Sequence, residues 1–277
     1  MNGSANDTPG GLMPPPRFGR TFLALFALGM LGVLALIPII LDTVDTLPPE
    51  MLELPPAVLV LVSLAQSMIL LAIAVAAGTI LAHRLGLRSL VADRVRTGAP
   101  IWPELRPHIG LAVGLGALFL AVAVIIDLLV APYADVDIVN GAPGFVDLLS
   151  ALVMGVLYGG ITEELLLRWG VMSFIAWAGW RLLQRGERVP GPGVMWLAIA
   201  LSALLFGIGH LPALAAQVPL TTTLVVRTVG LNALGGVIFG WLFWQYSLEV
   251  AMASHATFHV ALFVLNLGVL ALGIGNA

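Results

Sequence analysis

Six stretches of this 277-residue chain are apolar over a longer distance than a strand or an ordinary core helix requires. A helix that crosses a lipid bilayer needs about 20 mostly apolar residues, and each of these stretches reaches that length. They cover residues 21–41, 56–82, 109–131, 194–214, 222–246 and 250–275. A further, longer apolar stretch lies between residues 145 and 185. We therefore predict an all-α fold, a polytopic transmembrane bundle of seven to eight helices.

The composition indicates a surface that faces lipid. The chain is 60% hydrophobic and 10% charged, whereas soluble domains carry about 25% charged residues. These figures exclude a disordered chain and a nucleic-acid-binding protein. The chain contains no Cys, which excludes disulfides, thiolate metal ligands and a Cys nucleophile. All 12 basic residues are Arg, so chemistry that needs a Lys amine is excluded as well.

The chain divides into three parts. Residues 1–20 form a tail rich in Gly and Pro that we predict to be disordered and cytoplasmic. Residues 21–144 hold the first three spans, and residues 145–275 hold the remaining helices. Arginines gather before the first span and in the connection 83–106. Because positive loops stay in the cytoplasm, we expect a multi-pass protein with a cytoplasmic N-terminus.

The segment 145–183 is too long for a simple crossing. Its 39 residues would form a helix of roughly 58 Å, nearly twice the hydrocarbon thickness of a bilayer. Either a short helix precedes the span, or one helix extends well beyond the lipid. The same uncertainty in depth affects His255, which lies near the expected cytoplasmic end of the last helix.

The first candidate functional motif is Glu163-Glu164-x-x-x-Arg168. Ionisable residues inside membrane helices are costly and indicate functional sites by default. Glu164 and Arg168 are spaced to pair on one helical face, in the favourable acid-before-base order. Adjacent residues of a helix point about 100° apart, so Glu163 is directed elsewhere and can act as a general base. The structural alternative is a buried ion pair beside a glutamate at a helix end.

Two histidine motifs follow. Phe206 lies one turn before His210, so its ring is expected to pack on the imidazole; the alternative is a glycine-rich packing face with an interfacial His. His255 and His259 share one helical face and can converge on a metal ion or a substrate oxygen. Their alternative role is that of two core histidines bonded to neighbouring helices.

The three motifs together are more informative than each alone. Glu163 precedes His210 by 47 residues, and His210 precedes His255 by 45. Each interval accommodates a loop and a membrane crossing, so the three helices can be neighbours in one bundle. A carboxylate base with two or three imidazoles in a dry cavity can activate water and stabilise a tetrahedral oxyanion. That chemistry is hydrolysis of a peptide bond.

In this order, the motifs resemble those of the CPBP family, which comprises CAAX prenyl endopeptidases and bacteriocin-processing enzymes and is also called the Abi family. The resemblance covers about residues 145–265, within the 145–275 helix bundle that we expect to be catalytic. It implies an intramembrane endopeptidase of bacterial type in the plasma membrane. The expected partners are membrane lipid and a hydrophobic or lipidated peptide or protein substrate.

The resemblance also implies roles for individual residues. The catalytic residues would be Glu163, His210, His255 and His259, with Glu164, Arg168 and Phe206 as supporting residues. Glu163 and His210 would activate water, while His255 and His259 would bind the oxyanion. The family usually has Asn or Asp where His259 stands, but a neutral imidazole can also donate a hydrogen bond. This third imidazole makes Glu163, His210, His255 and His259 a candidate ligand set for a divalent metal such as zinc.

Two other classes of function stay open from the sequence. A non-enzymatic membrane protein, such as an immunity protein, would bind peptides in the same cavity without cleaving them. A secondary transporter would use Glu163 and the histidines as a proton relay. The chain is short for a transporter and shows no inverted repeat, so hydrolysis is the leading hypothesis.

Overall fold

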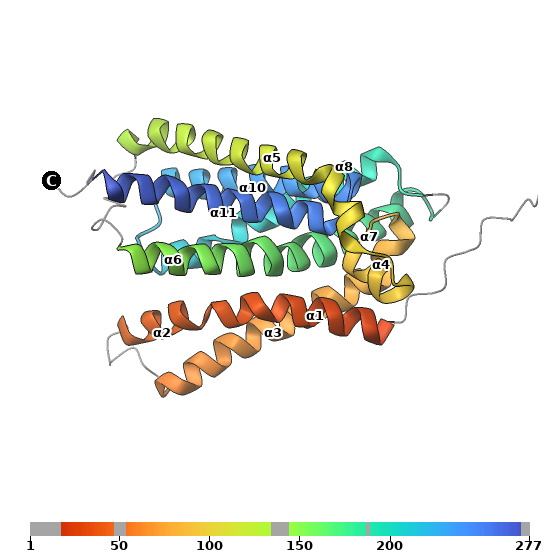
Figure 1. The fold of residues 1–277 in the computed structure, drawn as a ribbon, viewed down its shortest axis with the longest axis horizontal. Helices are drawn as coiled ribbons and strands as arrows, with labels where there is room; N and C mark the ends of the chain where they lie inside the picture. The colour runs from red at the N-terminus through yellow and green to blue at the C-terminus, as the bar shows by residue number, and fades with distance from the viewer. Residues whose placement is uncertain (1–17, 47–53, 134–143, 187–188, 273–277) are drawn as a thin grey trace, which may run out of the picture.

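The structure is a computed structural model that describes residues 18–46, 54–133, 144–186 and 189–272. Within these ranges all regular structure is helical (Figure 1), which confirms the predicted all-α class. Most of the predicted N-terminal tail lies outside the described residues. Its last three residues, 18–20, belong to the first helix, which begins at Phe18.

The described residues form α-helices, 3₁₀-helices and π-helices. In chain order they are α1 (Phe18–Ala35), α2 (Ile37–Thr46), α3 (Pro56–Leu81), η2 (Ala82–Leu85), α4 (Leu90–Thr97), α5 (Ile101–Val130), η3 (Ala131–Tyr133), α6 (Phe145–Met154), η4 (Gly155–Glu163), η5 (Leu165–Met172), α7 (Ser173–Leu183), α8 (Pro192–Gly209), α9 (Leu211–Ala215), α10 (Thr222–Gln245) and α11 (Leu248–Ala271). The segments η2 and η3 are 3₁₀-helices, whereas η4 and η5 are π-helices.

Seven helical stretches of the described chain are long and apolar enough to cross a membrane, which confirms the expected number. They cover residues 18–44, 56–85, 101–133, 145–183, 192–215, 222–245 and 248–271. The largest difference from the sequence prediction is at α5, which begins eight residues before the predicted span. Its first two turns contain Glu104 and Arg106, so a count of apolar residues does not include them.

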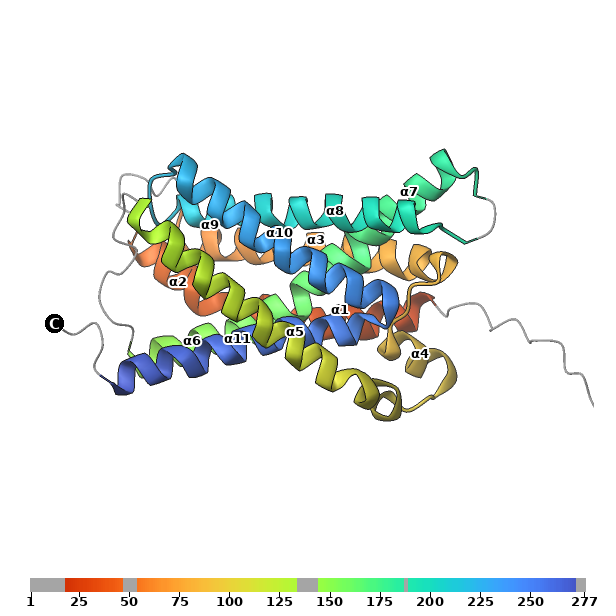
Figure 2. The same cartoon turned by 90° about the horizontal axis from the view of Figure 1, so that it is seen from above.

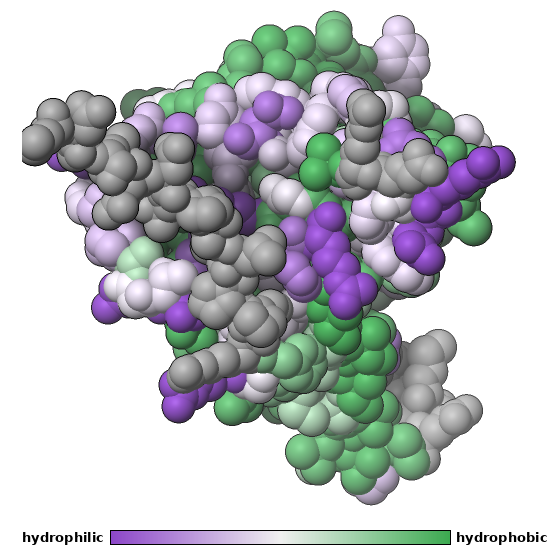
Figure 3. Space-filling model, turned by 90° about the vertical axis from the view of Figure 1, so that its right-hand side faces the viewer, coloured by the Kyte–Doolittle hydropathy of each residue, from purple (hydrophilic) through white to green (hydrophobic). Residues whose placement is uncertain are grey.

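The outer surface of the bundle is suited to lipid. Only 17% of the most apolar window of α3 is buried inside the protein. Large side chains such as Leu61 and Leu128 are 65% and 70% exposed. Hydrophilic side chains instead gather on the end face that carries α4 and α7 (Figure 3). Apolar flanks with a polar end face are the surface expected of an integral membrane protein.

The segment Phe145–Leu183 is one continuous helical run at the centre of the bundle, made of α6, η4, η5 and α7. The helix α1 packs against η4, and α3 packs against η5. The helix α11 contacts both η4 and α5, while α8 lies against α10 (Figures 1 and 2). Of the two arrangements that the sequence allowed, the single long helix is therefore correct. Its middle is π-helical, a form often found at functional sites.

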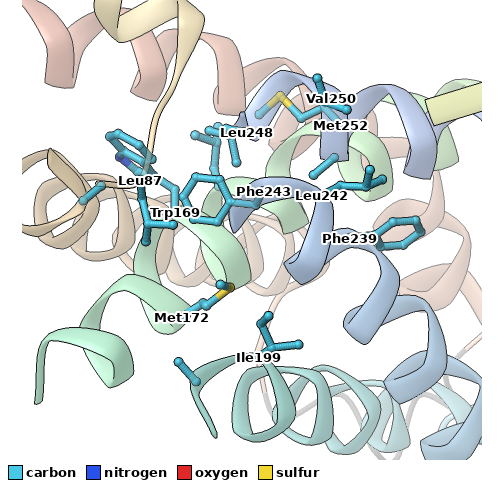
Figure 4. Close-up of a cluster of buried hydrophobic side chains, with 14 of the residues drawn as sticks. Leu87, Trp169, Met172, Ile199, Phe239, Leu242, Phe243, Leu248, Val250 and Met252 are labelled. Atoms are coloured by element: carbon cyan, nitrogen blue, oxygen red, sulfur yellow. The ribbon is translucent and has the colours of Figure 1, made fainter. Parts of the chain in front are cut away.

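Buried apolar side chains join the central helix to the last two helices. Trp169 and Met172 of η5 belong to one core cluster with Phe239 and Phe243 of α10 and Leu248 of α11 (Figure 4). Trp169 and Phe243 are in ring contact, with centroids 6.1 Å apart. This core fixes the two helices that face the Glu163–Glu164 segment.

A buried carboxylate holds the beginning of α11. Glu249 accepts hydrogen bonds from the Ser89 hydroxyl at 2.6 Å and from the backbone N–H groups of Leu90 and Val91 at 2.8 and 3.0 Å. These amides open the first turn of α4, where backbone donors lack partners within the helix. The contact therefore ties α11 to α4 six residues before His255.

Candidate active site

Three helices bring Glu163, His210 and His255 together. Glu163 is the last residue of η4, His210 directly follows α8, and His255 lies in the second turn of α11. The Glu163 Oε1 atom is 3.8 Å from Nε2 of His210, and its Oε2 atom is 4.0 Å from Nε2 of His255. Both distances exceed a direct hydrogen bond. The structure thus gathers the carboxylate and the two imidazoles as the spacing predicted.

Glu164, the next residue along the helix, contacts two partners of its own. Its Oε2 atom lies 3.3 Å from Nε of Arg168, which is the predicted ion pair. Its Oε1 atom lies 2.9 Å from Nδ1 of His255, a contact that the sequence did not reveal. Both Glu164 and Arg168 are almost completely buried. The two neighbouring glutamates therefore approach opposite nitrogens of the same imidazole.

The hydrogen bond at Nδ1 of His210 and of His255 decides whether the Nε2 atom of the same ring is a donor or an acceptor. Nδ1 of His210 lies 2.8 Å from the Phe206 carbonyl, which can only accept, so this nitrogen carries the proton. The Glu164 carboxylate imposes the same tautomer on His255. In the neutral rings both Nε2 atoms are therefore acceptors that face a third acceptor, Glu163. The oxyanion role implied for His255 consequently requires a protonated ring.

Aromatic rings surround the ionisable groups. Phe206 meets His210 edge to face, with centroids 4.8 Å apart, as the one-turn spacing predicted. Phe239 stacks on His255 at 4.4 Å and 15°. The guanidinium carbon of Arg168 lies 4.6 Å from the centroid of the Phe206 ring, a favourable cation–π distance. These rings pack on the two imidazoles and help to fix their orientation.

His259 stacks on His255 and does not converge with it on one point. The two ring centroids are 5.2 Å apart and the ring planes differ by 25°. The lone pair of an imidazole nitrogen lies in the ring plane, so nearly parallel rings direct their lone pairs along separate planes. Within the described ranges, no group of three or more His, Asp or Glu side chains is arranged to hold a metal ion. The predicted set of Glu163, His210, His255 and His259 does not fit a zinc site in this arrangement.

Two glycines of η4 make room for the histidines of α11. A Cβ atom on Gly159 would lie 2.6 Å from Nε2 of His259 and 3.4 Å from Nε2 of His255. A Cβ atom on Gly155 would overlap the His259 ring as well. Neither glycine was predicted to belong to the site, although Gly155 and Gly159 have the Gly-x-x-x-Gly spacing typical of close helix contacts.

We expect Gly159→Ala to lower the rate of any reaction at this site by at least about tenfold, since a 1 Å displacement of reacting groups can cost about 100-fold. The added methyl group would displace His259, whose ring stacks on His255. Gly114→Ala is the matched control, because no atom lies within 4 Å of its Cβ position. Turnover of both variants, with thermal unfolding in detergent, checks the expectation. Equal turnover in both variants would contradict it.

A cavity of about 570 Å³ opens beside these residues. Its lining includes Tyr158, Glu163, His210, Asn232, His255 and His259. Arg227 also lines it and forms a two-point ion pair with Asp127, with both N···O distances at 2.7 Å. Tyr158 was not singled out from the sequence, where a tyrosine five residues before Glu163 carries no recognised motif.

The fold and the site define a class, a multi-pass membrane protein with a buried acid–base cluster. A family model described as Type II CAAX prenyl endopeptidase Rce1-like matches residues 145–261, a segment that contains every candidate site residue. The match confirms the resemblance of this segment to the CPBP family of intramembrane proteases and supports an intramembrane endopeptidase in general. No curated protein and no solved structure matches the chain.

Proposed function

We propose that this protein hydrolyses a peptide bond of a membrane-associated, hydrophobic or lipidated substrate with a water molecule activated by Glu163 and His210. The observation that carries this proposal is the placement of the Glu163 carboxylate within 3.8 and 4.0 Å of two Nε2 atoms, at the wall of a cavity. A water molecule in that position would donate one hydrogen bond to the Glu163 carboxylate and another to the unprotonated Nε2 atom of His210 or His255.

The reaction would begin when this water attacks the carbonyl carbon of the scissile bond. The new C–O bond forms as the carbonyl electron pair moves to its oxygen, and Glu163 takes the proton from the water. His210 orients the water through Nε2. When the C–N bond breaks, Glu163 returns the proton to the departing nitrogen, which leaves a carboxylic acid and an amine. General acid–base steps of this kind contribute about 10²–10⁴-fold each.

His255 would have a second task in the same cycle. If its Nε2 atom gains a proton, the Glu164 carboxylate at 2.9 Å balances the charge of the imidazolium. The protonated ring then donates at Nε2 to negative charge in the cavity. Glu164 would therefore be a positioning residue for His255 as well as the partner of Arg168.

The experiment that tests the proposal compares membranes from cells that express the wild-type protein or Glu163→Ala. We expect new protein termini that appear only with the wild type, close to hydrophobic or lipidated segments. The purified wild type in liposomes should cleave peptides that span those termini. Identical sets of termini in the two membranes would reject hydrolysis at this site.

We also propose that the end of the bundle with α4 faces the cytoplasm, because its connection contains five of the twelve arginines. The chain has no Cys, so single cysteines can report sidedness. In intact cells, a membrane-impermeant thiol reagent should label Ala216→Cys and should not label Thr97→Cys. Both residues are exposed, and they lie at opposite ends of the bundle. The reverse labelling pattern would invert the orientation.

A further inference from the structure

The proposed hydrolysis needs a second hydrogen-bond donor, because the Glu163–histidine cluster (Glu163, His210, His255 and His259) offers only one to the cavity in its neutral state. Resting on that proposed function, we propose that the Tyr158 hydroxyl donates a hydrogen bond to the oxyanion of the tetrahedral intermediate, next to His259. Tyr158 would then be a catalytic residue in addition to Glu163 and the histidines.

The need for a further donor follows from the tautomers. His210 and His255 present acceptor nitrogens to the cavity while their rings are neutral, because Nδ1 of each ring donates to Phe206 or to Glu164. Glu163 is an acceptor as well. His259 can donate, but its ring is stacked on His255, so the two rings do not converge on one oxygen. Negative charge that develops on a carbonyl oxygen would therefore have one neutral donor from this set.

Tyr158 is in the right place to supply a second donor. It belongs to the same π-helical segment as Glu163 and precedes it by five residues, the spacing of one π-helical hydrogen bond. The two side chains therefore project from similar sides of η4, and both line the cavity. The next residue is Gly159, whose Cβ position would lie 2.6 Å from Nε2 of His259 and 3.4 Å from Nε2 of His255.

The other donors around the cavity are engaged or buried; the Thr228 hydroxyl, which has no hydrogen-bond partner among the described residues, is a buried atom. The side-chain amide of Asn232 donates to the Thr228 carbonyl at 2.9 Å, and that of Gln217 donates to the Ala213 carbonyl at 3.2 Å. The Arg227 guanidinium is held by Asp127. By contrast, the Tyr158 hydroxyl forms no hydrogen bond with any other residue in the part of the chain that the structure describes. It is therefore available to a substrate.

The hydroxyl would act without giving up its proton. As water adds to the carbonyl carbon, the electron pair of the C=O bond moves to oxygen, and the Tyr158 O–H bond points at the new charge. Collapse of the intermediate restores the carbonyl and releases this hydrogen bond. A donor that binds the oxyanion more strongly than the ground-state carbonyl raises kcat with little effect on KM.

The test is Tyr158→Phe, which removes only the hydroxyl oxygen. We expect kcat for a prenylated peptide that ends in a CAAX sequence to fall by about 10²–10³-fold, the effect of losing one oxyanion donor. KM should change by less than about threefold, because ground-state binding is kept. Binding of a phosphonamidate analogue of the same peptide, a tetrahedral mimic, should weaken by a factor close to that in kcat/KM.

Tyr246→Phe is the matched control. Tyr246 packs against His108 and Trp241 at the end of α10, away from the residues that line the cavity. The kcat of the Tyr246→Phe variant should therefore equal that of the wild type. Wild-type kcat in Tyr158→Phe would overturn the inference, as would a rise in KM with kcat unchanged. A wild type that cleaves no prenylated peptide and creates no Glu163-dependent termini would instead reject the proposed function, and the role of Tyr158 with it.

Discussion

Glu163→Gln is expected to lower kcat by about 10²–10⁴-fold, the range for loss of a general base. The amide has the size of the carboxylate but cannot take the proton from the attacking water. The side chain lies beside the cavity, and no hydrogen bond ties it to another described residue, so the fold should tolerate the change. Cleavage of a prenylated CAAX peptide by purified protein in liposomes measures the effect.

The control for Glu163→Gln is Glu104→Gln. Glu104 is an exposed glutamate in the first turn of α5, away from the cavity, and it pairs with Arg88 at 3.0 Å. Removal of its charge should therefore leave turnover unchanged. Thermal unfolding of both variants in detergent separates a chemical defect from a folding defect. A Glu163→Gln protein with wild-type turnover would show that another group is the base.

Glu164→Gln should have the largest effect on stability. Arg168 is 1% exposed, and its guanidinium forms no hydrogen bond to any other described residue, so the Glu164 carboxylate at 3.3 Å is its nearest counter-charge. Removing one member of a buried ion pair costs about 3–5 kcal/mol in the free energy of unfolding, because the other charge stays buried and uncompensated. Unfolding in a graded series of detergent mixtures measures the loss.

A second substitution separates the two tasks of Glu164. In the double variant Glu164→Gln/Arg168→Met, both charges are absent, so most of the lost stability should return. The rate should stay about 10²-fold or more below that of the wild type, because a neutral amide cannot balance an imidazolium at His255. Full recovery of the rate together with the stability would show that Glu164 serves only the ion pair.

Much of the site could be predicted because its parts are short-range patterns. The pairing of Glu164 with Arg168 and the contact of Phe206 with His210 depend on the spacing along one helix, and both are present. The convergence of Glu163, His210 and His255 was a weaker prediction, based on intervals that permit neighbouring helices. The family match covers residues 145–261, which contain all three motifs.

Other features depended on contacts between helices. The bond from His255 to Glu164 joins residues 91 positions apart, and it reverses the hydrogen-bonding role expected of Nε2 in the neutral ring. The spacing of His255 and His259 suggested convergence, yet the two rings stack because Gly155 and Gly159 let α11 lie directly against η4. Tyr158 could not be recognised for the same reason: its position gains meaning only beside the imidazoles.

The amino-acid sequence alone determined that the chain crosses a membrane as a bundle of helices and that its rare charges form motifs, since hydropathy and helical spacing are local properties. Only the tertiary structure decided which nitrogen of His210 and of His255 lies against an acceptor, which rings stack, and which residues line the cavity. Those properties follow from the rotation and close approach of η4, α8 and α11, which many residues far apart in the chain set together.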